Sequence, residues 1–290
     1  MNYAALIDNR KSVRAFEDRQ APESLLTELR EFYEKDSLVL SPRLPMELNI
    51  LGADCGPALA QAAGYEQAPA GAPHYLVLSA PEGRTAAIQV GFLMEKLLLK
   101  LQDLGLSACW ISFGDSQKVK DALGLSGPLE VTAIAAFGYG LPREKKLRMN
   151  LATMSCADII AQRGYYAPKK DIRELVFVDR VDNIQGLDEK IGFYEDMLWQ
   201  AFYACSKAPS YLNRQPYAFL LKEDQILLAA LPDPYTDERS LYLDLGIVLL
   251  HFSAVAGKWE EKISWSLENL PSADLPEGAF LAACCSCRIN

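Results

Sequence analysis

The segment 10–14, near the start of the chain, combines basic and hydroxyl side chains. Arg10, Ser12 and Arg14 alternate along it, and Lys11 lies between the first two. In an extended backbone alternate residues point to one side, so two guanidinium groups and a hydroxyl would face the same ligand. Such a set can hold a phosphate group and the polar edge of a ring. A solvated basic stretch is the competing interpretation of the same residues.

A second group of polar side chains lies at 209–216, between two prolines that restrict the backbone at both ends. After Pro209, the residues Ser210, Asn213 and Gln215 offer donors and acceptors that suit the edge of a planar heterocycle. An ordinary polar turn after a helix would show the same composition. The segment alone does not decide between these two interpretations.

Two further segments could contact a ligand. Residues 112–114 end a short apolar run after a strongly apolar helix, and a glycine there lets a backbone N–H approach a ligand closely. A simple strand and turn is the alternative for this segment. The best basic cluster of the chain consists of Lys145, Lys146 and Arg148. It fits either a phosphate clamp or a solvated linker.

Composition narrows the classes of partner. The chain has 290 residues with 29 Lys and Arg against 38 Asp and Glu, so its net charge is −9. An acidic surface repels phosphate backbones, so we expect neither nucleic acid nor a membrane as a partner. The seven cysteines are odd in number and lack a disulfide-framework spacing, and the start of the chain has no apolar signal core. Together these features lead us to expect a cytoplasmic protein.

Other catalytic signatures are missing from the sequence. His74 and His251 are the only histidines and are isolated in apolar surroundings, so we expect packed, hydrogen-bonded core residues. No nucleophile elbow and no dinucleotide-binding glycine motif follows a strand. The cysteines at 284, 285 and 287 have no second Cys/His pair at zinc spacing. The residues therefore name no catalytic side chain and no metal site.

The elements that must position these segments recur in the two parts of the chain. The first part predicts helices at 25–33, 85–104 and 118–123 and strands at 46–51, 75–79, 108–111 and 130–139. The second part predicts helices at 187–206 and 243–256 and strands at 217–222, 225–230 and 279–288. Between them, 140–170 is expected to be a connection with a short helix at 156–163. The order helix, loop, strand, apolar helix, tryptophan occurs twice, ending at Trp110 and at Trp259, which suggests an internal duplication.

Taken in this order, the segments resemble the nitroreductase-like family of FMN-dependent flavoproteins. The resemblance rests on four stretches, at 10–14, 90–111, 208–216 and 242–246, and extends over most of the chain. It implies an α+β fold in which a mixed, mostly antiparallel sheet is packed with helices. It also implies that FMN lies where two subunits or halves meet.

The resemblance assigns a role to each segment. The segment 10–14 would contact the FMN phosphate and ring, and the cluster at 145–148 would complete the phosphate site. The backbone at 112–114 would lie near flavin N5, and the loop 209–216 would reach the ring from the opposite side. The residues implied in FMN binding are Arg10, Lys11, Ser12, Arg14, Ser112, Phe113, Gly114, Lys145, Lys146, Arg148, Pro209, Ser210, Asn213 and Gln215.

The chain departs from the family pattern in one respect. In the family, the Ser/Asn/Gln loop follows the first helix, but here that stretch, 40–45, contains no Asn or Gln. The loop occurs only in the second part, which has no good copy of Arg-x-Ser-x-Arg. The simplest account is a fused pair of degenerate halves, similar to a known branch of the family. Residues 1–150 would supply the phosphate and N5 side and residues 151–290 the ring-edge loop.

This arrangement implies a pseudo-dimer with one FMN site per chain, which needs no second copy. The resemblance implies an oxidoreductase in which FMN accepts hydride from NAD(P)H and passes electrons to a small planar acceptor, such as a nitroaromatic or quinone. Two alternatives stay open. The chain could bind FMN as a carrier or sensor without turnover, or it could have lost the flavin site and serve partner binding.

Overall fold

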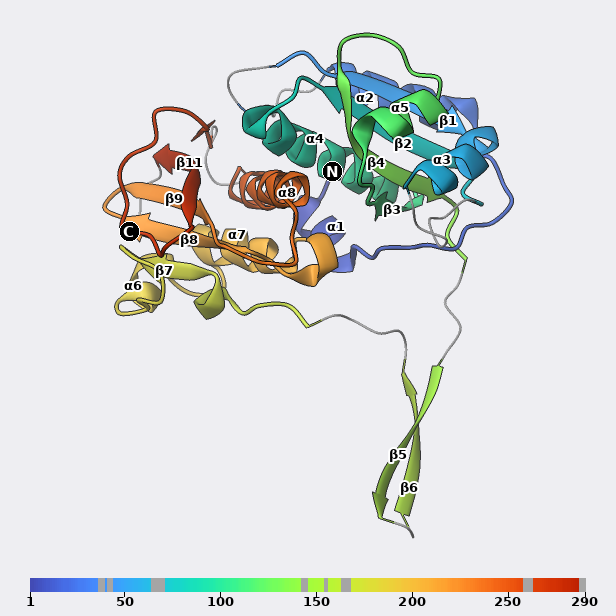
Figure 1. Ribbon diagram of the computed structural model, residues 1–290. Helices are drawn as coiled ribbons and strands as arrows, with labels where there is room; N and C mark the ends of the chain where they lie inside the picture. The colour runs from blue at the N-terminus through green and yellow to red at the C-terminus, as the bar shows by residue number, and fades with distance from the viewer. Residues whose placement is uncertain are drawn as a thin grey trace.

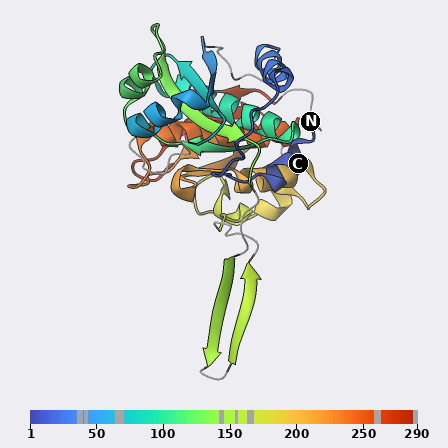
Figure 2. The same ribbon diagram turned by 90° about the vertical axis from the view of Figure 1, so that its right-hand side faces the viewer.

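Two antiparallel-rich sheets flank a central pair of long helices (Figure 1). The computed structural model describes residues 1–35, 40, 44–63, 71–141, 146–153, 156–162, 168–257 and 263–286, and only the backbone of those between 146 and 162. The mixed α+β class predicted from the sequence is confirmed. A hairpin extends away from both sheets in the two views (Figures 1 and 2).

The first sheet has four strands in the order β1–β2–β4–β3, each pair antiparallel. They are β1 (Glu47–Gly52), β2 (His74–Ala80), β3 (Ser107–Ile111) and β4 (Glu130–Gly138). All residues of β2 are buried, which explains its unbroken apolar sequence. Alternate residues of this strand face different cores: Leu76 packs with the apolar face of the long helix α4, and Val77 packs on the other side of the sheet.

The second sheet repeats this order and adds a fifth strand at one edge. It runs β10–β11–β9–β8–β7, and only the β7–β8 pair is parallel. Its strands are β7 (Val176–Val178), β8 (Tyr217–Lys222), β9 (Gln225–Ala230), β10 (Trp265–Ser266) and β11 (Phe280–Ser286). Read in chain order, β8, β9, β10 and β11 occupy the places of β1, β2, β3 and β4. The strands predicted at 217–222 and 225–230 are present, and the strand predicted at 279–288 is present as β11 up to Ser286, with 287 and 288 outside the described residues.

The central pair consists of α4 (Arg84–Asp103) and α8 (Glu238–Ala256). They lie side by side between the two sheets (Figures 1 and 2). A Cβ on Gly91 would lie 2.2 Å from the Leu243 carbonyl oxygen, and one on Gly246 would lie 1.9 Å from that of Ile88. The two backbones can therefore approach this closely only because both positions are glycine.

The helix α8 is long and apolar enough to span a membrane by length and composition, with a mean hydropathy of 1.3. Its residues from Asp244 to Ala256 are nevertheless all buried inside the protein. A helix that is apolar nearly all round is expected at the centre of a large core.

The central helices and the third strand of each sheet show the duplication in register. Arg84 and Arg239, Gly91 and Gly246, and Trp110 and Trp265 are all 155 positions apart. Their elements correspond, because α4 matches α8 and β3 matches β10. The predicted counterpart of Trp110, Trp259, lies outside the described residues, and Trp265 in β10 takes the equivalent place. Pattern alone could not set this register because the two halves share few residue types.

Shorter helices surround these layers. They are α1 (Tyr3–Asn9), α2 (Glu23–Glu34), α3 (Gly56–Ala63), α5 (Ser116–Ala122), α6 (Leu187–Ile191) and α7 (Met197–Lys207). Single 3₁₀ turns occur at η1 (Ala53–Cys55), η2 (Ile172–Glu174) and η3 (Tyr211–Asn213). The helix α1 crosses from the first half to the second: Ile7 joins the core of the second sheet, and Tyr203 of α7 donates to Asp8 over 3.3 Å.

Two predicted helices are wrong. The segment expected as a helix at 156–163 forms strand β6 (Cys156–Gln162), which pairs with β5 (Lys146–Thr153) in the projecting hairpin. The helix expected at 187–206 is two helices, α6 and α7, because Gly192 adopts a φ of 72° that a continuing right-handed helix does not allow. The division at residue 150 falls within β5 and stays a prediction.

Candidate functional site

The segment 10–14 runs alongside strand β3 of the first sheet. Ser12 forms a parallel bridge with Ala108, and the Val13 N–H donates to the Ala108 carbonyl over 3.1 Å. Burial raises the pKa of the Cys109 thiol in this strand to about 11, while the charges of Arg14 and Arg10 both act to lower it. The extended backbone expected for this segment is therefore present, and both guanidinium groups lie near the same strand.

Arg10 turns its guanidinium group into the protein. Its Nε lies 2.5 Å from Oε1 of Glu95, and its Nη2 lies 3.2 Å from Oε2 of the same carboxylate. The Nε contact is short but badly angled for a hydrogen bond, so it is chiefly an ion-pair contact. Arg14, by contrast, is exposed and forms no ion pair with a residue that the structure describes. The two arginines of the motif thus differ in role, the first paired internally and the second open to a ligand.

Glu95, on α4, is the centre of a buried network that joins the two halves. It accepts a hydrogen bond from Trp110 Nε1 over 2.9 Å, and its Oε1 lies 3.4 Å from Nε2 of His251 on α8. Burial favours a higher pKa for the Glu95 carboxyl, but Arg10, His251 and Trp110 together hold it below its ordinary value. A carboxylate with no exposed surface is stabilised here because three donors surround it.

His251 is a packed and hydrogen-bonded core residue, as predicted. Its Nδ1 lies 2.9 Å from the Ala204 carbonyl, which can only accept, so this nitrogen carries a proton. Its other nitrogen faces the Glu95 carboxylate. Both ring nitrogens therefore face oxygen acceptors.

The loop 209–216 is held mainly by its own polar side chains. Ser210 Oγ accepts from the Gln215 N–H over 2.9 Å, and Asn213 Nδ2 donates to the Pro168 carbonyl over 2.6 Å. Gln215 is 1% exposed and donates to the Ser206 carbonyl over 3.1 Å. Asn213 and Gln215 have positive φ angles of 58° and 50°, so these bonds hold an unusual backbone. In this structure the three side chains shape the loop.

A buried aspartate fastens this loop to α8. Both carboxylate oxygens of Asp244 lie 3.0 Å from the Tyr211 N–H. Burial raises the pKa of the Asp244 carboxyl well above its usual range. The first half shows the equivalent bond, because the Leu44 N–H donates over 3.3 Å to Gln89 on α4, which lies 155 positions before Asp244.

Lys169 links the charges of the two halves electrostatically. Its Nζ donates to the Ala208 carbonyl over 2.8 Å. Burial, followed by the positive charge of Arg10, lowers the pKa of Lys169 to about 8, against the opposing charges of Asp244 and Glu95. The segment 10–14 and the base of the loop 209–216 therefore act on one buried amine.

The segment 112–114 follows β3 and meets the beginning of α8. Arg239 Nη2 donates to the Gly114 carbonyl over 2.5 Å, and its guanidinium carbon lies 4.3 Å from the centre of the Phe113 ring. Ser112 and Phe113 are half-buried and Gly114 is exposed. A residue of the second half thus covers the segment that the sequence assigned to the first half of the site.

We call the region between the two halves that contains Glu95, Lys169 and Arg239 the seam. The predicted phosphate cluster does not lie there. Lys145 lies outside the described residues, and only the backbone of Lys146 and Arg148 is described. Both residues lie in β5, in the hairpin that projects away from the two sheets (Figure 1). The structure therefore places Arg14 and Lys169 at the seam and these two residues elsewhere.

Three side chains at the seam escaped the sequence analysis. Glu95 was hidden in an apolar helix, Lys169 in a presumed connection, and Arg239 just before the expected helix start. The one signal available was a charged residue at a position that the apolar pattern assigns to the core, as at Glu95. Among the described residues, no group of three or more His, Cys, Asp or Glu side chains could hold a metal ion.

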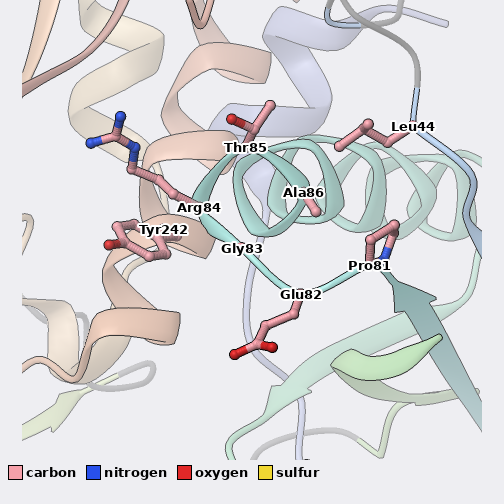
Figure 3. Close-up of a pocket in the computed structure, with 8 residues that line it drawn as sticks. All are labelled: Leu44, Pro81, Glu82, Gly83, Arg84, Thr85, Ala86 and Tyr242. Atoms are coloured by element: carbon pink, nitrogen blue, oxygen red, sulfur yellow. The ribbon is translucent and has the colours of Figure 1, made fainter. Parts of the chain in front are cut away.

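A cavity of about 500 Å³ lies away from these residues, at the N-terminus of α4 (Figure 3). In that view Arg84 and Tyr242 lie on one side of the opening and Leu44 and Pro81 on the other. Arg84 stacks on Phe280 at 5.1 Å, as Arg239 stacks on Phe113. The cavity therefore occupies the place related by the duplication to the beginning of α8.

Comparison with known proteins gives the chain its family. The family model described as "Putative TM nitroreductase" matches residues 2–256, which is most of the chain. The chain belongs to this nitroreductase family. No curated protein sequence matches it significantly.

A solved structure similar over the whole length is a "putative nitroreductase" from Thermotoga maritima, with 18% identity and a TM-score of 0.58 over 99% of this chain and 94% of that one. This likeness shows that the nitroreductase-family fold is shared.

Shorter structures match about half of this chain. An FMN-dependent nitroreductase from Clostridium difficile has 18% identity and a TM-score of 0.43 over 49% of this chain and 88% of its own. A protein described as "Putative NADH dehydrogenase/NAD(P)H nitroreductase" from Parabacteroides distasonis has 19% identity and a TM-score of 0.44 over 50% and 90%.

Proposed function

We propose that this nitroreductase-family protein is an FMN-dependent oxidoreductase, which uses NAD(P)H to reduce small planar acceptors such as nitroaromatics or quinones. One observation carries the proposal. The Lys169 amine donates to the carbonyl of Ala208, just before the loop 209–216, and the positive charge of Arg10, from the segment 10–14, lowers the pKa of the same amine. The positive charges of Arg10 and Lys169 come from the two halves of the chain and lie at the seam. They suit a ligand that is anionic at one end and polar along a ring edge.

The side chains at the seam fit FMN. Arg14 is exposed beside β3, and Lys169 adds a second cation, so a phosphate would find positive charge in a chain whose net charge is −9. On the other side, Nη1 of Arg239 is buried without a hydrogen-bond partner, beside the segment 112–114. A second ligand bound beside the flavin would supply the acceptor that this atom lacks.

When bound, FMN would supply the redox chemistry, taking reducing equivalents from NAD(P)H and passing them to the acceptor. The chain would supply binding and electrostatics. Glu95 holds Arg10 in place, Asp244 holds the loop through Tyr211, and Lys169 carries a positive charge between them. Asn213 and Gln215 would fix the conformation of the loop, and the backbone of the loop would contact the flavin ring.

An absorbance spectrum tests this function. We expect the purified protein, as isolated or after addition of FMN and gel filtration, to retain a flavin band near ~450 nm. NADH or NADPH added without air should bleach that band, and a nitroaromatic or quinone should restore it. Retention of FMN without bleaching would instead indicate a carrier or sensor, and failure to retain FMN would refute the proposal.

A further inference from the structure

Arg239 reaches from the second half of the chain onto the first. It is the second residue of α8, and its guanidinium carbon lies over the Phe113 ring, 4.3 Å from the ring centre, a cation–π contact. One amino group donates to the Gly114 carbonyl over 2.5 Å. Stacking and this bond leave the long side chain little freedom, so the guanidinium is held in one orientation before any ligand arrives.

The other amino group of Arg239 has no partner. Its Nη1 is buried and makes no hydrogen bond in the part of the chain that the structure describes. A buried donor left without an acceptor costs free energy, and the cost is larger when the donor is charged. Such an atom in a native protein calls for an explanation, and a bound acceptor group is one.

The duplication supplies an internal comparison. Arg84, 155 positions earlier, is the first residue of α4, and its guanidinium carbon lies 5.1 Å from the centre of the Phe280 ring. Arg84 is exposed, so its side chain is open to solvent. The two sites share a stacked arginine, but only Arg239 presents a buried donor, so the burial is a property of that site and not of the repeated motif.

The segment that Arg239 covers is the one assigned to the flavin N5 side. Gly114 and Phe113 are only partly buried, so a ligand can approach them from solvent. The aromatic ring of Phe113 offers a flat apolar wall, and the planar guanidinium matches the two oxygens of a carboxylate. An aromatic ring with a carboxylate fits both features at once.

We propose that Arg239 is a specificity-determining residue that selects aromatic acceptors carrying a carboxylate. Its Nη1 donates to a carboxylate oxygen, and the aromatic ring of the acceptor lies beside Phe113. The inference rests on the proposed function, because it places the acceptor next to a flavin at 112–114. The inference adds that the acceptor carries a negative charge, whereas the proposed function does not specify the charge of the acceptor.

Binding of benzoate and of benzamide tests this role without turnover. The two probes have nearly the same shape, and only benzoate carries the charge. In calorimetric titrations of the FMN-loaded protein we expect benzoate to bind roughly 10- to 100-fold more tightly, the range of a charged hydrogen bond. Arg239→Met should remove this preference, and Arg239→Lys should retain part of it. Arg84→Met is the matched control, and it should keep the preference of the unchanged protein.

Kinetics give a second readout on the same variants. With 4-nitrobenzoate, Arg239→Met should raise KM by a similar factor and leave kcat nearly unchanged, while KM for 4-nitrobenzamide stays constant.

A protein that takes up FMN and is reduced by NAD(P)H, yet binds benzoate and benzamide equally, overturns the role of Arg239 alone. An unchanged preference in Arg239→Met with normal FMN content does the same. A protein that takes up no FMN overturns both this role and the proposed function.

Discussion

At the scale of single residues, the site depends on how charges are divided between the interior and the surface. Arg10 lies inside with Glu95, whose other partners are Trp110 and His251. Removing one member of such a buried set leaves the others unsatisfied, which costs more than losing an exposed ion pair. Arg14 remains exposed and carries the charge that is available to a phosphate.

This division predicts the effect of Arg14→Ala. The variant should fold normally because the side chain is exposed, and it should weaken FMN binding by about 1.5–3 kcal/mol, the value of a charged hydrogen bond. Fluorescence titration of FMN measures the dissociation constant. Arg173→Ala is the control, since Arg173 forms an exposed ion pair with Asp188 at 2.8 Å, and it should leave FMN affinity unchanged. Equal affinities in both variants would exclude Arg14 from the site.

Lys169 gives the site a predicted pH dependence. Burial lowers its pKa to about 8, so the amine is charged below that pH and neutral above it. The FMN phosphate, with a second pKa near ~6, stays dianionic throughout this range. FMN should therefore bind more weakly as the pH rises from 7 to 9, as the amine loses the charge that attracts the phosphate.

The control for this pH effect is Lys169→Met. It should bind FMN more weakly at pH 7 and show a nearly flat profile up to pH 9. A profile as steep as that of the unchanged protein would assign the titration to another group.

At the scale of elements, α8 organises the site. Arg239 at its beginning reaches Gly114, Asp244 in its second turn holds Tyr211, and His251 further along faces Glu95 of α4. The contact between His251 and Glu95 depends directly on how closely α4 and α8 approach. That distance is set by Gly91 and Gly246, where a Cβ would clash with the facing backbone.

Gly246→Ala should therefore disturb both stability and the site. The added Cβ would lie 1.9 Å from the Ile88 carbonyl oxygen, so the helices must separate. We expect a loss of roughly 1–3 kcal/mol or more in the free energy of unfolding, measured by urea denaturation, together with weaker FMN binding. Gly71→Ala is the control, because a Cβ there meets no atom within 4 Å. Equal stability of the two variants would contradict the close packing of the helices.

At the scale of the whole molecule, the chain is a pair of related halves that have diverged. Both have the same strand order and a central helix. Only the first has the segment 10–14, and only the second has a loop with Asn213 and Gln215. The cavity at Arg84 lies at the duplicated place and is lined mainly by first-half residues, such as Leu44 and Pro81, together with Tyr242 from the second half.

This asymmetry predicts one FMN per chain. Protein saturated with FMN and freed of excess should contain one flavin per chain by absorbance, since the place at Arg84 lacks a counterpart of the segment 10–14. Light scattering should give a mass near 32.1 kDa, because the two halves already form the seam within one chain. A content of two flavins per chain would show that both places bind, and a mass of twice this value would show that a second copy is needed.

The sequence determined much of the fold, because periodicity and composition act locally. The apolar runs at 75–79 and 217–222 led directly to β2 and β8, and the long apolar helix at 85–104 to α4. Local patterns failed at Gly192, where a single residue ends one helix before the next begins. They also failed in the hairpin of β5 and β6, because the spacing of its apolar residues fits both the helical and the strand period.

The tertiary structure alone decided how the site residues divide their roles. The residue types at 10–14 do not reveal that Arg10 faces Glu95, because that contact joins positions 85 apart. Nor do they reveal Arg239, which donates to Gly114 in the other half of the chain, or Lys169, on which charges of both halves act. The amino-acid order fixes which groups exist, whereas the packing of α4 against α8 decides which of them meet, since burial and distance set the energy of every charge at the seam.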